Sequence, residues 1–265
     1  MAVVTKVTKT RAPGRYNIYL DDEFSFAVDE KILIKYDLFK DNVFDDAAIA
    51  DIKKAEFEQK AYQIALVYAT GKMRSKGQVI LKLKEKEVPN DVIATVITRL
   101  ENTNVLDDAL FVEEYIRSAI SSGKLGPKGV KYKLQQLGVD KFAVEDGLEL
   151  YTEDDQIEIL ERRVASLIEK NGRQAKFMAE QKTTQKLLQD GFDQRLIKRA
   201  IQAYNAENEA DPEQEWDNLV NEAEKLAAKY ADYAGWEFKN KLKAGMFRKG
   251  FDLGMVDRWL RENGH

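Results

Sequence analysis

Hydrophobic and polar residues alternate along the first thirty positions, and the spacing then becomes helical. The alternation covers residues 3–9, 15–20 and 24–28, with turn residues at Pro13-Gly14 and over residues 21–23. Alternation of period two is typical of strands with one buried face, and Pro and acidic residues suit the turns between them. The pattern predicts a three-stranded antiparallel meander that is covered by a helix over residues 29–36.

From residue 45 onward, one apolar sequence motif occurs four times. It contains Leu or Met, then Gly or Glu four positions later, then Val or Phe, then two aliphatic residues at helical spacing. The Gly or Glu position is occupied by Glu87, Gly138, Gly191 and Gly250, at intervals of 51, 53 and 59 residues. Self-similarity at such a period indicates a tandem helical array.

We therefore predict a mainly α fold, in which the N-terminal meander is followed by four tandem three-helix repeats in an elongated curved array. The predicted segments are residues 1–50 for the meander and its helix, then 51–105, 106–150, 151–210 and 211–265 for the repeats.

Local signals place helix ends within the repeats. Ser75 followed by Gln78 fits a capping box and predicts a helix over residues 76–86. Pro89 suits the first turn of the next helix. The recurring Gly fits the left-handed residue that ends the second helix of a repeat. Glu87 takes this place in the first repeat, so we expect that turn to be closed differently.

The acidic pairs Asp107-Asp108 and Asp154-Asp155 stand where the first helices of the second and third repeats begin. Carboxylates there cap free N–H groups and meet the positive end of the helix dipole. We interpret both pairs as caps, in preference to catalytic dyads or metal ligands.

The last repeat departs most from the pattern. Its three tryptophans, Trp216, Trp236 and Trp259, have helical core spacing, and we predict that they pack in the core. The preceding stretch AENEADPEQE, residues 206–215, is acidic and contains Pro. Such a composition predicts a flexible linker and the main hinge of the chain.

The composition leaves few groups for catalysis. The chain has no cysteine, and its one histidine, His265, is the last residue. Thiolate nucleophiles and Cys-rich metal sites are thereby excluded, and the usual general base at neutral pH is poorly placed. The glycines of residues 123–129 lack the spacing of a phosphate-binding loop. We predict no enzyme activity, no metal site and no cofactor.

Charge separates one part of the chain from the rest. The chain has 42 Lys and Arg against 46 Asp and Glu, a net charge of −4, which argues against a protein that coats nucleic acid. Residues 51–105 carry 10 basic and 7 acidic residues, or +3. We select the basic residues of the first two repeats as candidate partner-binding residues, the alternative being a solvated helix face. They are Lys72, Arg74, Lys76, Lys82, Lys86, Arg117, Lys124, Lys128 and Lys131.

No apolar run reaches the length of a membrane span, and the first ten residues lack the apolar core of a signal peptide. We expect a cytoplasmic monomer with no membrane partner.

Three stretches of this chain together resemble the RecX family. They are RYNIYLDDEFSFAVDE (residues 15–30), KMRSKGQVILKLKEKEV (residues 72–88) and VLDDALFVEEYIRSAISSGKLGPKGVKYKLQQLGV (residues 105–139). The most specific part is LDD-x-x-F-x-x-x-Y-[IV]-R followed by GP-x-x-[IV]-x-x-x-L-x-x-x-G-[IV]. The likeness is good up to residue 148 and weaker beyond it. Gly77 and Glu87 depart from the family pattern.

The resemblance implies a negative regulator of the bacterial recombinase RecA, and so a role in DNA recombination, DNA repair and the SOS response. It implies binding to the RecA–DNA filament, along its groove and with weak direct DNA contact, and suppression of recombinase and ATPase activity. From the residues alone, a helix-turn-helix DNA-binding protein is the alternative, because a three-helix unit can place its third helix in a major groove. The third helices predicted at 91–100 and 140–148 are too poor in basic residues to favour it.

Overall fold

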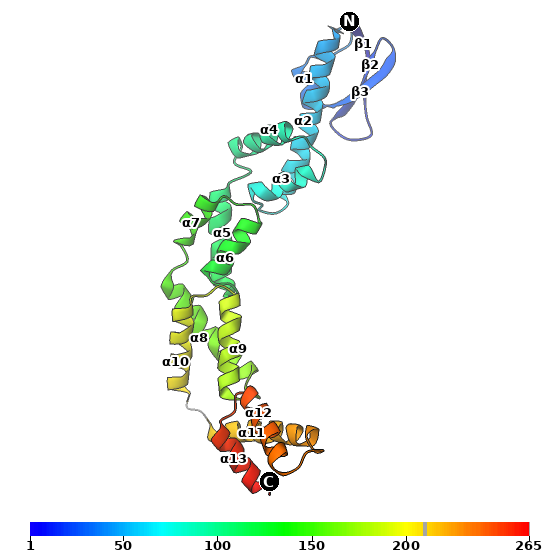
Figure 1. Ribbon diagram of the computed structural model, residues 1–265. Helices are drawn as coiled ribbons and strands as arrows, with labels where there is room; N and C mark the ends of the chain where they lie inside the picture. The colour runs from blue at the N-terminus through cyan, green and yellow to red at the C-terminus, as the bar shows by residue number, and fades with distance from the viewer. Residues whose placement is uncertain (209–210, 265) are drawn as a thin grey trace. The chain divides into compact units, whose positions relative to one another are not determined.

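A computed structural model describes residues 1–208 and 211–264 (Figure 1). The chain divides into two compact units. One unit comprises Met1–Val112 with Gln136–Ala143, and the other comprises Glu113–Gln135 with the chain from Val144 onward. The chain is mainly helical, with an N-terminal antiparallel sheet and three-helix repeats after it, so the predicted fold class is confirmed. The elongated, curved arrangement of the repeats stays a prediction.

The predicted meander is present. Strand β1 is Ala2–Lys9, β2 is Arg15–Leu20 and β3 is Glu23–Asp29, and β2 pairs with both neighbours in antiparallel fashion. Asp21 and Asp22 form the two-residue connection between β2 and β3, with φ of 48° and 70°. Positive φ at both residues matches the right-handed twist of the two strands.

The sheet has one more strand than the sequence predicts. Strand β4, Val43–Phe44, pairs with residues 2 and 3 of β1, so that the strand order is β3-β2-β1-β4. Two residues are too few to produce an alternating pattern, which is why the sequence did not indicate this strand.

Helix α1, Glu30–Lys35, and helix α2, Asp46–Thr70, cover the apolar face of the sheet. Asp29 caps α1 by accepting a hydrogen bond from the Lys31 amide. Glu56 of α2 accepts from the Arg15 guanidinium and from the Asp29 amide, each at 2.7 Å. These bonds fix α2 against β2 and β3. The core beneath consists of Val4, Ile18, Val28, Ile32, Leu33, Leu38 and Ile52.

The same helix α2 continues into the first repeat, where α3, Lys76–Lys84, and α4, Asn90–Asn102, pack with it. The capping box of Ser75 and Gln78 is confirmed, and α3 ends two residues before the predicted end. Pro89 stands directly before α4 as its N-cap. The small residues Ala61, Ala65 and Ala69 of α2 are buried in this core.

Nine further helices follow among the described residues, in three groups of three. They are α5 Asp108–Ser122, α6 Pro127–Gln136, α7 Lys141–Leu148; α8 Glu153–Lys170, α9 Lys176–Gln189, α10 Gln194–Glu207; and α11 Pro212–Lys229, α12 Gly235–Arg248, α13 Leu253–Glu262.

The prediction of a ten-residue linker over 206–215 is wrong. Helix α10 continues to Glu207, and α11 begins at Pro212 with Asp211 as its N-cap. Asp followed by Pro is a helix-start signal, which here outweighs the linker-like composition. Residues 209 and 210 of the predicted linker lie outside the described residues.

The recurring glycines take the predicted left-handed conformation, with φ of 77° at Gly138, 87° at Gly191 and 85° at Gly250. The expectation of a different turn at Glu87 is wrong, because Glu87 adopts the same conformation with φ of 57°. The amide of Val88 then donates to the Leu83 carbonyl at 3.1 Å. At the Gly191 and Gly250 turns, the amide of the residue after the glycine forms the equivalent hydrogen bond. A non-glycine residue can enter this region at a cost of about 1–2 kcal/mol.

A close backbone contact recurs where one repeat packs on the next. In the first unit, Gly77 of α3 lies against Gly138. In the second unit, Gly126 and Gly129 lie against the turn at Gly191, and the Gly126 amide donates to the Asp190 carbonyl at 2.9 Å. Thus the start of the second helix of one repeat packs on the turn that ends the second helix of the following repeat.

Two of the three tryptophans pack as predicted. Trp259 is buried in the core of α11–α13, and Trp216 packs at the edge of that core. The prediction is wrong for Trp236, which is 79% exposed. Trp236 lies in the first turn of α12, whose buried face is formed by Phe238, Leu242 and Met246 at spacings of four residues.

Candidate partner-binding surface

Basic side chains of the first unit gather around Tyr68, near the C-terminal end of α2. The Arg74 guanidinium carbon lies 4.4 Å from the centroid of the Tyr68 ring, and Lys82 Nζ lies 5.9 Å from it. Arg74 comes from the connection between α2 and α3, and Lys82 comes from α3. Cations over an aromatic ring are attracted by its quadrupole, so Tyr68 holds both basic side chains at this site.

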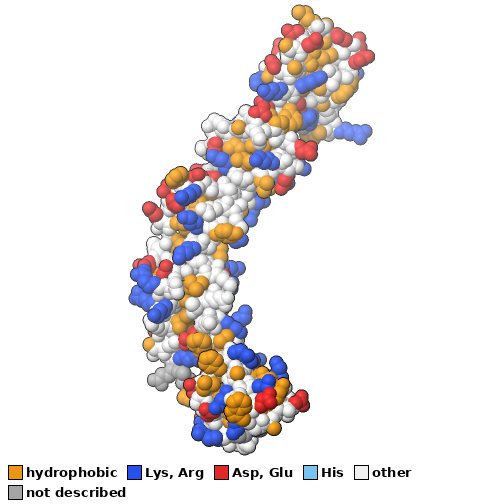
Figure 2. All heavy atoms as spheres, viewed as in Figure 1, with side chains coloured by type: hydrophobic (Ala, Val, Ile, Leu, Met, Phe, Trp, Pro, Cys, Tyr) orange, Lys and Arg blue, Asp and Glu red, His pale blue; other side chains and the backbone are white. Residues whose placement is uncertain are grey.

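These residues line an open groove with a volume of about 680 Å³. Its lining combines cationic and aliphatic side chains and contains no carboxylate. Figure 2 shows hydrophobic side chains beside Lys and Arg at the surface of the part of the molecule that holds α3 and α4. The groove, called here the Tyr68 groove, is lined by Gln63, Ile64, Val67, Tyr68, Gly71, Lys72, Arg74 and Lys82.

Arg74 carries an unsatisfied donor. Its Nε is buried, and no hydrogen-bond acceptor for it is present among the described residues. A buried donor without an acceptor is costly, by about 1–3 kcal/mol, and more for a charged group. This atom is closed to a partner, so Arg74 contributes to the Tyr68 groove as one of the cationic residues that line it.

Lys82 is only partly compensated. Its Nζ donates to Glu85 Oε2 at 2.9 Å, and this hydrogen bond raises the pKa of Lys82 above its usual value. A raised pKa keeps the ammonium group charged throughout the neutral range. Glu85 is not among the residues that line the groove, so the lining itself remains positive.

Lys76, another candidate residue, has a structural role. It is the first residue of α3, its ammonium group forms an ion pair with Glu101 of α4, and its amide donates to Asp108 Oδ1 at 2.7 Å. The hydrogen bond to Glu101 raises the pKa of Lys76. Lys76 thus connects helices of the first unit and is not part of the groove lining. Lys86 is exposed just beyond the end of α3.

Asp107, Asp108 and Asp155 cap helices as predicted, Asp108 at another helix than expected, and Asp154 lies in the first turn of α8. Asp107 accepts from the Leu110 amide at 3.0 Å at the start of α5, and Asp155 forms a capping box with Thr152 at the start of α8. Asp108 caps α3 instead, through the amide of Lys76. Burial raises the pKa of Asp108, and the bond from that amide opposes the rise.

The remaining candidate residues belong to the second unit. Arg117 of α5 forms ion pairs with Glu113 and with Glu114, the latter at 3.8 Å. Lys131 of α6 pairs with Glu145 at 3.0 Å. Lys124 and Lys128 are exposed where the α5–α6 connection leads into α6. Of the nine candidates, the structure brings Lys72, Arg74 and Lys82 together in one groove.

The groove residues of α2 were not predicted from the sequence. Ile64, Val67 and Tyr68 were not among the candidate partner-binding residues. Val67 is 73% exposed and Ile64 is 37% exposed. Their spacing of three residues, next to an aromatic residue, was the available signal, since such residues share one helix face.

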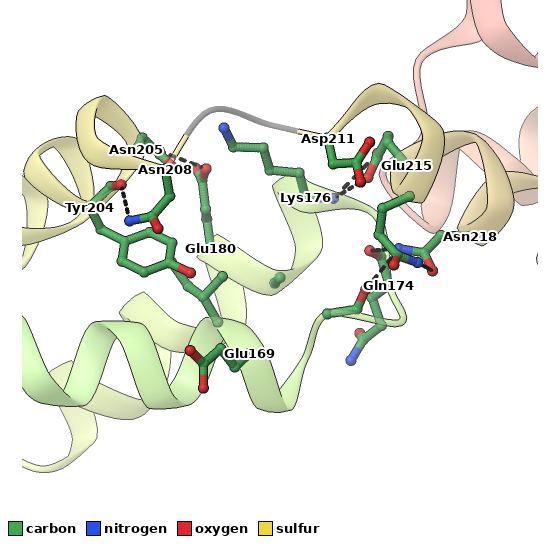
Figure 3. Close-up of a pocket in the computed structure, with 14 residues that line it drawn as sticks. Glu169, Gln174, Lys176, Glu180, Tyr204, Asn205, Asn208, Asp211, Glu215 and Asn218 are labelled. Carbon is green, nitrogen blue, oxygen red and sulfur yellow. Dashed lines mark hydrogen bonds between the residues drawn. The ribbon is translucent and has the colours of Figure 1, made fainter.

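A second, partly open pocket of about 260 Å³ is lined by residues between α8 and α11 in the second unit (Figure 3). Glu180 accepts from Asn205 at 2.9 Å, and Glu215 accepts from the Lys176 amide at 3.1 Å. Burial raises the pKa of Glu215, and the bond from Lys176 opposes the rise. These polar groups bond to one another across helix ends, as Figure 3 shows, so we assign them to holding α9 against α10 and α11.

No group of three or more His, Cys, Asp or Glu side chains that could hold a metal ion occurs among the described residues. None of the described helices is both long enough and apolar enough to span a bilayer.

Four models of known protein domains match this chain. The one described as the regulatory protein RecX N-terminal domain matches residues 2–45. Those described as the first, second and third three-helix domains of RecX match residues 61–100, 107–148 and 213–260. The third of these covers most of α11–α13.

Curated proteins and solved structures give the same result. Regulatory protein RecX of Levilactobacillus brevis is 33% identical over 264 residues, which is 100% of this chain and 98% of that protein. Regulatory protein RecX of Limosilactobacillus reuteri (strain DSM 20016) is 32% identical, over 98% of both chains. A crystal structure of regulatory protein RecX superposes with a TM-score of 0.67 at 30% identity, over 77% of this chain and 100% of that one.

Proposed function

Because this chain belongs to the RecX family of regulatory proteins, we propose that it is a negative regulator of the recombinase RecA. It binds the RecA–DNA filament along its groove and lowers recombinase and ATPase activity. It acts as a cytoplasmic monomer in recombination, DNA repair and the SOS response, and contacts DNA weakly if the filament exposes it.

The observation that carries this proposal is the Tyr68 groove. A filament of protein on DNA presents carboxylates and phosphates, and a positive groove on a protein of net charge −4 would orient the two partners by charge complementarity. The relatives are named regulatory proteins, and the chain has no Cys and no His before position 265 with which to build a nucleophile and a general base. Binding without catalysis is the function that these features support.

DNA-dependent ATP hydrolysis by RecA tests the proposal, measured with and without this protein at a fixed DNA concentration. We expect the rate of hydrolysis to fall as the protein is added. An unchanged rate at concentrations well above that of RecA would contradict the proposal.

Charge reversal tests the role of the groove in the same assay. The variant Lys72→Glu/Lys82→Glu should inhibit less than the parent, and the loss should be larger at low salt, where charges are least screened. Lys54→Glu/Lys84→Glu is the matched control, because both lysines are exposed and neither lines the groove. Equal loss in the two variants would show that only overall charge matters.

One observation favours the alternative of a helix-turn-helix DNA-binding protein. Helix α10, the third helix of its group, exposes Gln194, Lys198, Arg199 and Gln202, which are side chains able to reach base edges or phosphates. This alternative predicts tight binding to bare duplex DNA with a steep salt dependence. The filament proposal predicts weak binding to bare duplex and inhibition that requires RecA.

A further inference from the structure

We propose that the Tyr68 groove binds an extended acidic peptide segment of a protein partner, with an aliphatic side chain on Ile64 and Val67 and a carboxylate beside Arg74. The identity of the partner rests on the proposed function, whereas the chemistry of the segment follows from the groove itself.

The apolar half of the groove lies on α2. Ile64 and Val67 are three residues apart and therefore share one face of the helix. They are 37% and 73% exposed, so aliphatic surface is left open to solvent directly beside the cationic residues. An aliphatic side chain of a partner would remove this surface from water, which is the general source of favourable free energy in association.

The cationic half points to a carboxylate. Lys72, Arg74 and Lys82 line the groove, and no acidic side chain does. A carboxylate placed there would accept a charge-assisted hydrogen bond from Arg74 and would lie near the ammonium groups of Lys72 and Lys82. The aliphatic and acidic positions are adjacent, so both can be met by neighbouring residues of one extended segment.

The arrangement around Tyr68 favours a peptide over single-stranded nucleic acid. Proteins that bind single strands stack bases on free aromatic faces. The Tyr68 ring is already covered by Arg74 at 4.4 Å, with Lys82 at 5.9 Å from its centroid. The exposed apolar side chains of the groove, Ile64 and Val67, are aliphatic and give bases no stacking platform.

The test uses an array of overlapping 15-residue peptides that covers the RecA sequence, probed with the labelled full-length protein. We expect binding to peptides in which Asp or Glu flanks Leu, Ile or Val. Val67→Ser should weaken that binding by about 5-fold or more, and Arg74→Gln by about 10-fold or more. Leu81→Ser is the control, because Leu81 is 60% exposed on α3 but lies outside the groove.

Three results would overturn the inference: no acidic peptide is bound, Val67→Ser and Leu81→Ser bind peptides equally, or a 15-nucleotide oligo(dT) displaces the bound peptide and loses affinity with Val67→Ser. The last result would identify the occupant as nucleic acid. Circular dichroism and melting of each variant verify folding, which changes at exposed positions such as Val67 and Leu81 seldom disturb.

The ATPase assay separates this inference from the proposed function. If the parent protein inhibits RecA but binds no acidic peptide, the inference fails and the proposed function stands. If the parent protein does not inhibit RecA, the proposed function fails, while binding of acidic peptides to the groove still supports the inference.

Discussion

Gly77 and Gly138, 61 residues apart in the sequence, are in backbone contact: a Cβ atom added to Gly77 would lie 2.5 Å from Gly138 Cα and 2.7 Å from its carbonyl oxygen. A Cβ atom added to Gly138 would lie 2.8 Å from Gly77 Cα. The hydroxyl of Ser75 also donates to the carbonyl of Leu137, the residue before Gly138. This contact joins the start of α3 to the turn that follows α6.

The contact predicts that Gly77→Ala destabilises the protein, although Ala favours helix by about 1 kcal/mol over Gly. The added methyl group must displace backbone, and such overpacking costs about 1–3 kcal/mol. Thermal and urea unfolding measure the effect. Gly71→Ala is the matched control, since Gly71 has a helical φ of −66° and its added Cβ would meet only the Val67 carbonyl, at 3.3 Å. Equal changes in both variants would contradict the close contact.

Glu87→Gly should stabilise the protein by about 0.5–1 kcal/mol. Glu87 has a φ of 57°, where an L-residue is strained and Gly is not, and the unfolded-state entropy of Gly offsets part of the gain. Glu87→Ala is the control, because Ala keeps the strain. If Ala and Gly at this position change the melting temperature equally, the turn is not strained at residue 87.

Trp236 should account for most of the tryptophan emission that iodide quenches, because it is 79% exposed while Trp259 is 4% exposed. Trp236→Phe should remove this fraction and change stability by less than about 0.5 kcal/mol. Trp259→Phe should leave the quenched fraction in place and lower stability by about 1–3 kcal/mol, because it empties part of a packed core. The opposite pattern would place Trp236 in the core, as the sequence suggested.

Tyr151 should make the stability of the protein sensitive to alkaline pH. Burial, together with the charge of Asp155, raises the pKa of Tyr151 from 10.0 to about 12, and its hydroxyl donates to the Leu125 carbonyl at 2.9 Å. Between pH 10 and 12 the unfolded chain releases this proton while the folded chain retains it, so stability falls as pH rises.

The difference in melting temperature between the parent and Tyr151→Phe measures this effect. It should favour the parent below pH 10 and shrink from pH 10 to 12. Tyr132→Phe is the control, since Tyr132 is 59% exposed. A difference that does not vary with pH would show that Tyr151 ionises equally in both states.

The predicted elongated array gives a measurable size. A compact chain of 265 residues has a radius of gyration of roughly 18 Å. Solution scattering should give a clearly larger value if the four repeats follow one another in an open curve. A value near that of a compact chain would contradict this arrangement.

Some of these features follow from residues close together in the sequence. The capping box of Ser75 and Gln78 and the left-handed conformation at Gly138 could be predicted, since helix caps and turns depend on a few neighbouring residues. The strands could be predicted because alternation repeats over several residues. The basic composition around residues 72–82 was visible for the same reason.

Other features depend on contacts between distant segments. From helix propensity alone, Gly77 only weakens α3. Its structural role is the close contact with Gly138, which the sequence does not show. The prediction that Trp236 packs in the core was wrong because the packing of Phe238 and Leu242 determines which face of α12 is buried. Strand β4 forms because its two residues pair with the free edge of β1.

The candidate site divides in the same way. The sequence by itself determined the repeat pattern, the helix ends and the set of basic residues. Only the tertiary structure decided that Lys76 pairs with Glu101 while Arg74 and Lys82 lie over Tyr68. A side chain's charge is fixed by its residue type, whereas its partner is fixed by packing, which brings together residues whose spacing in the chain carries no periodic signal.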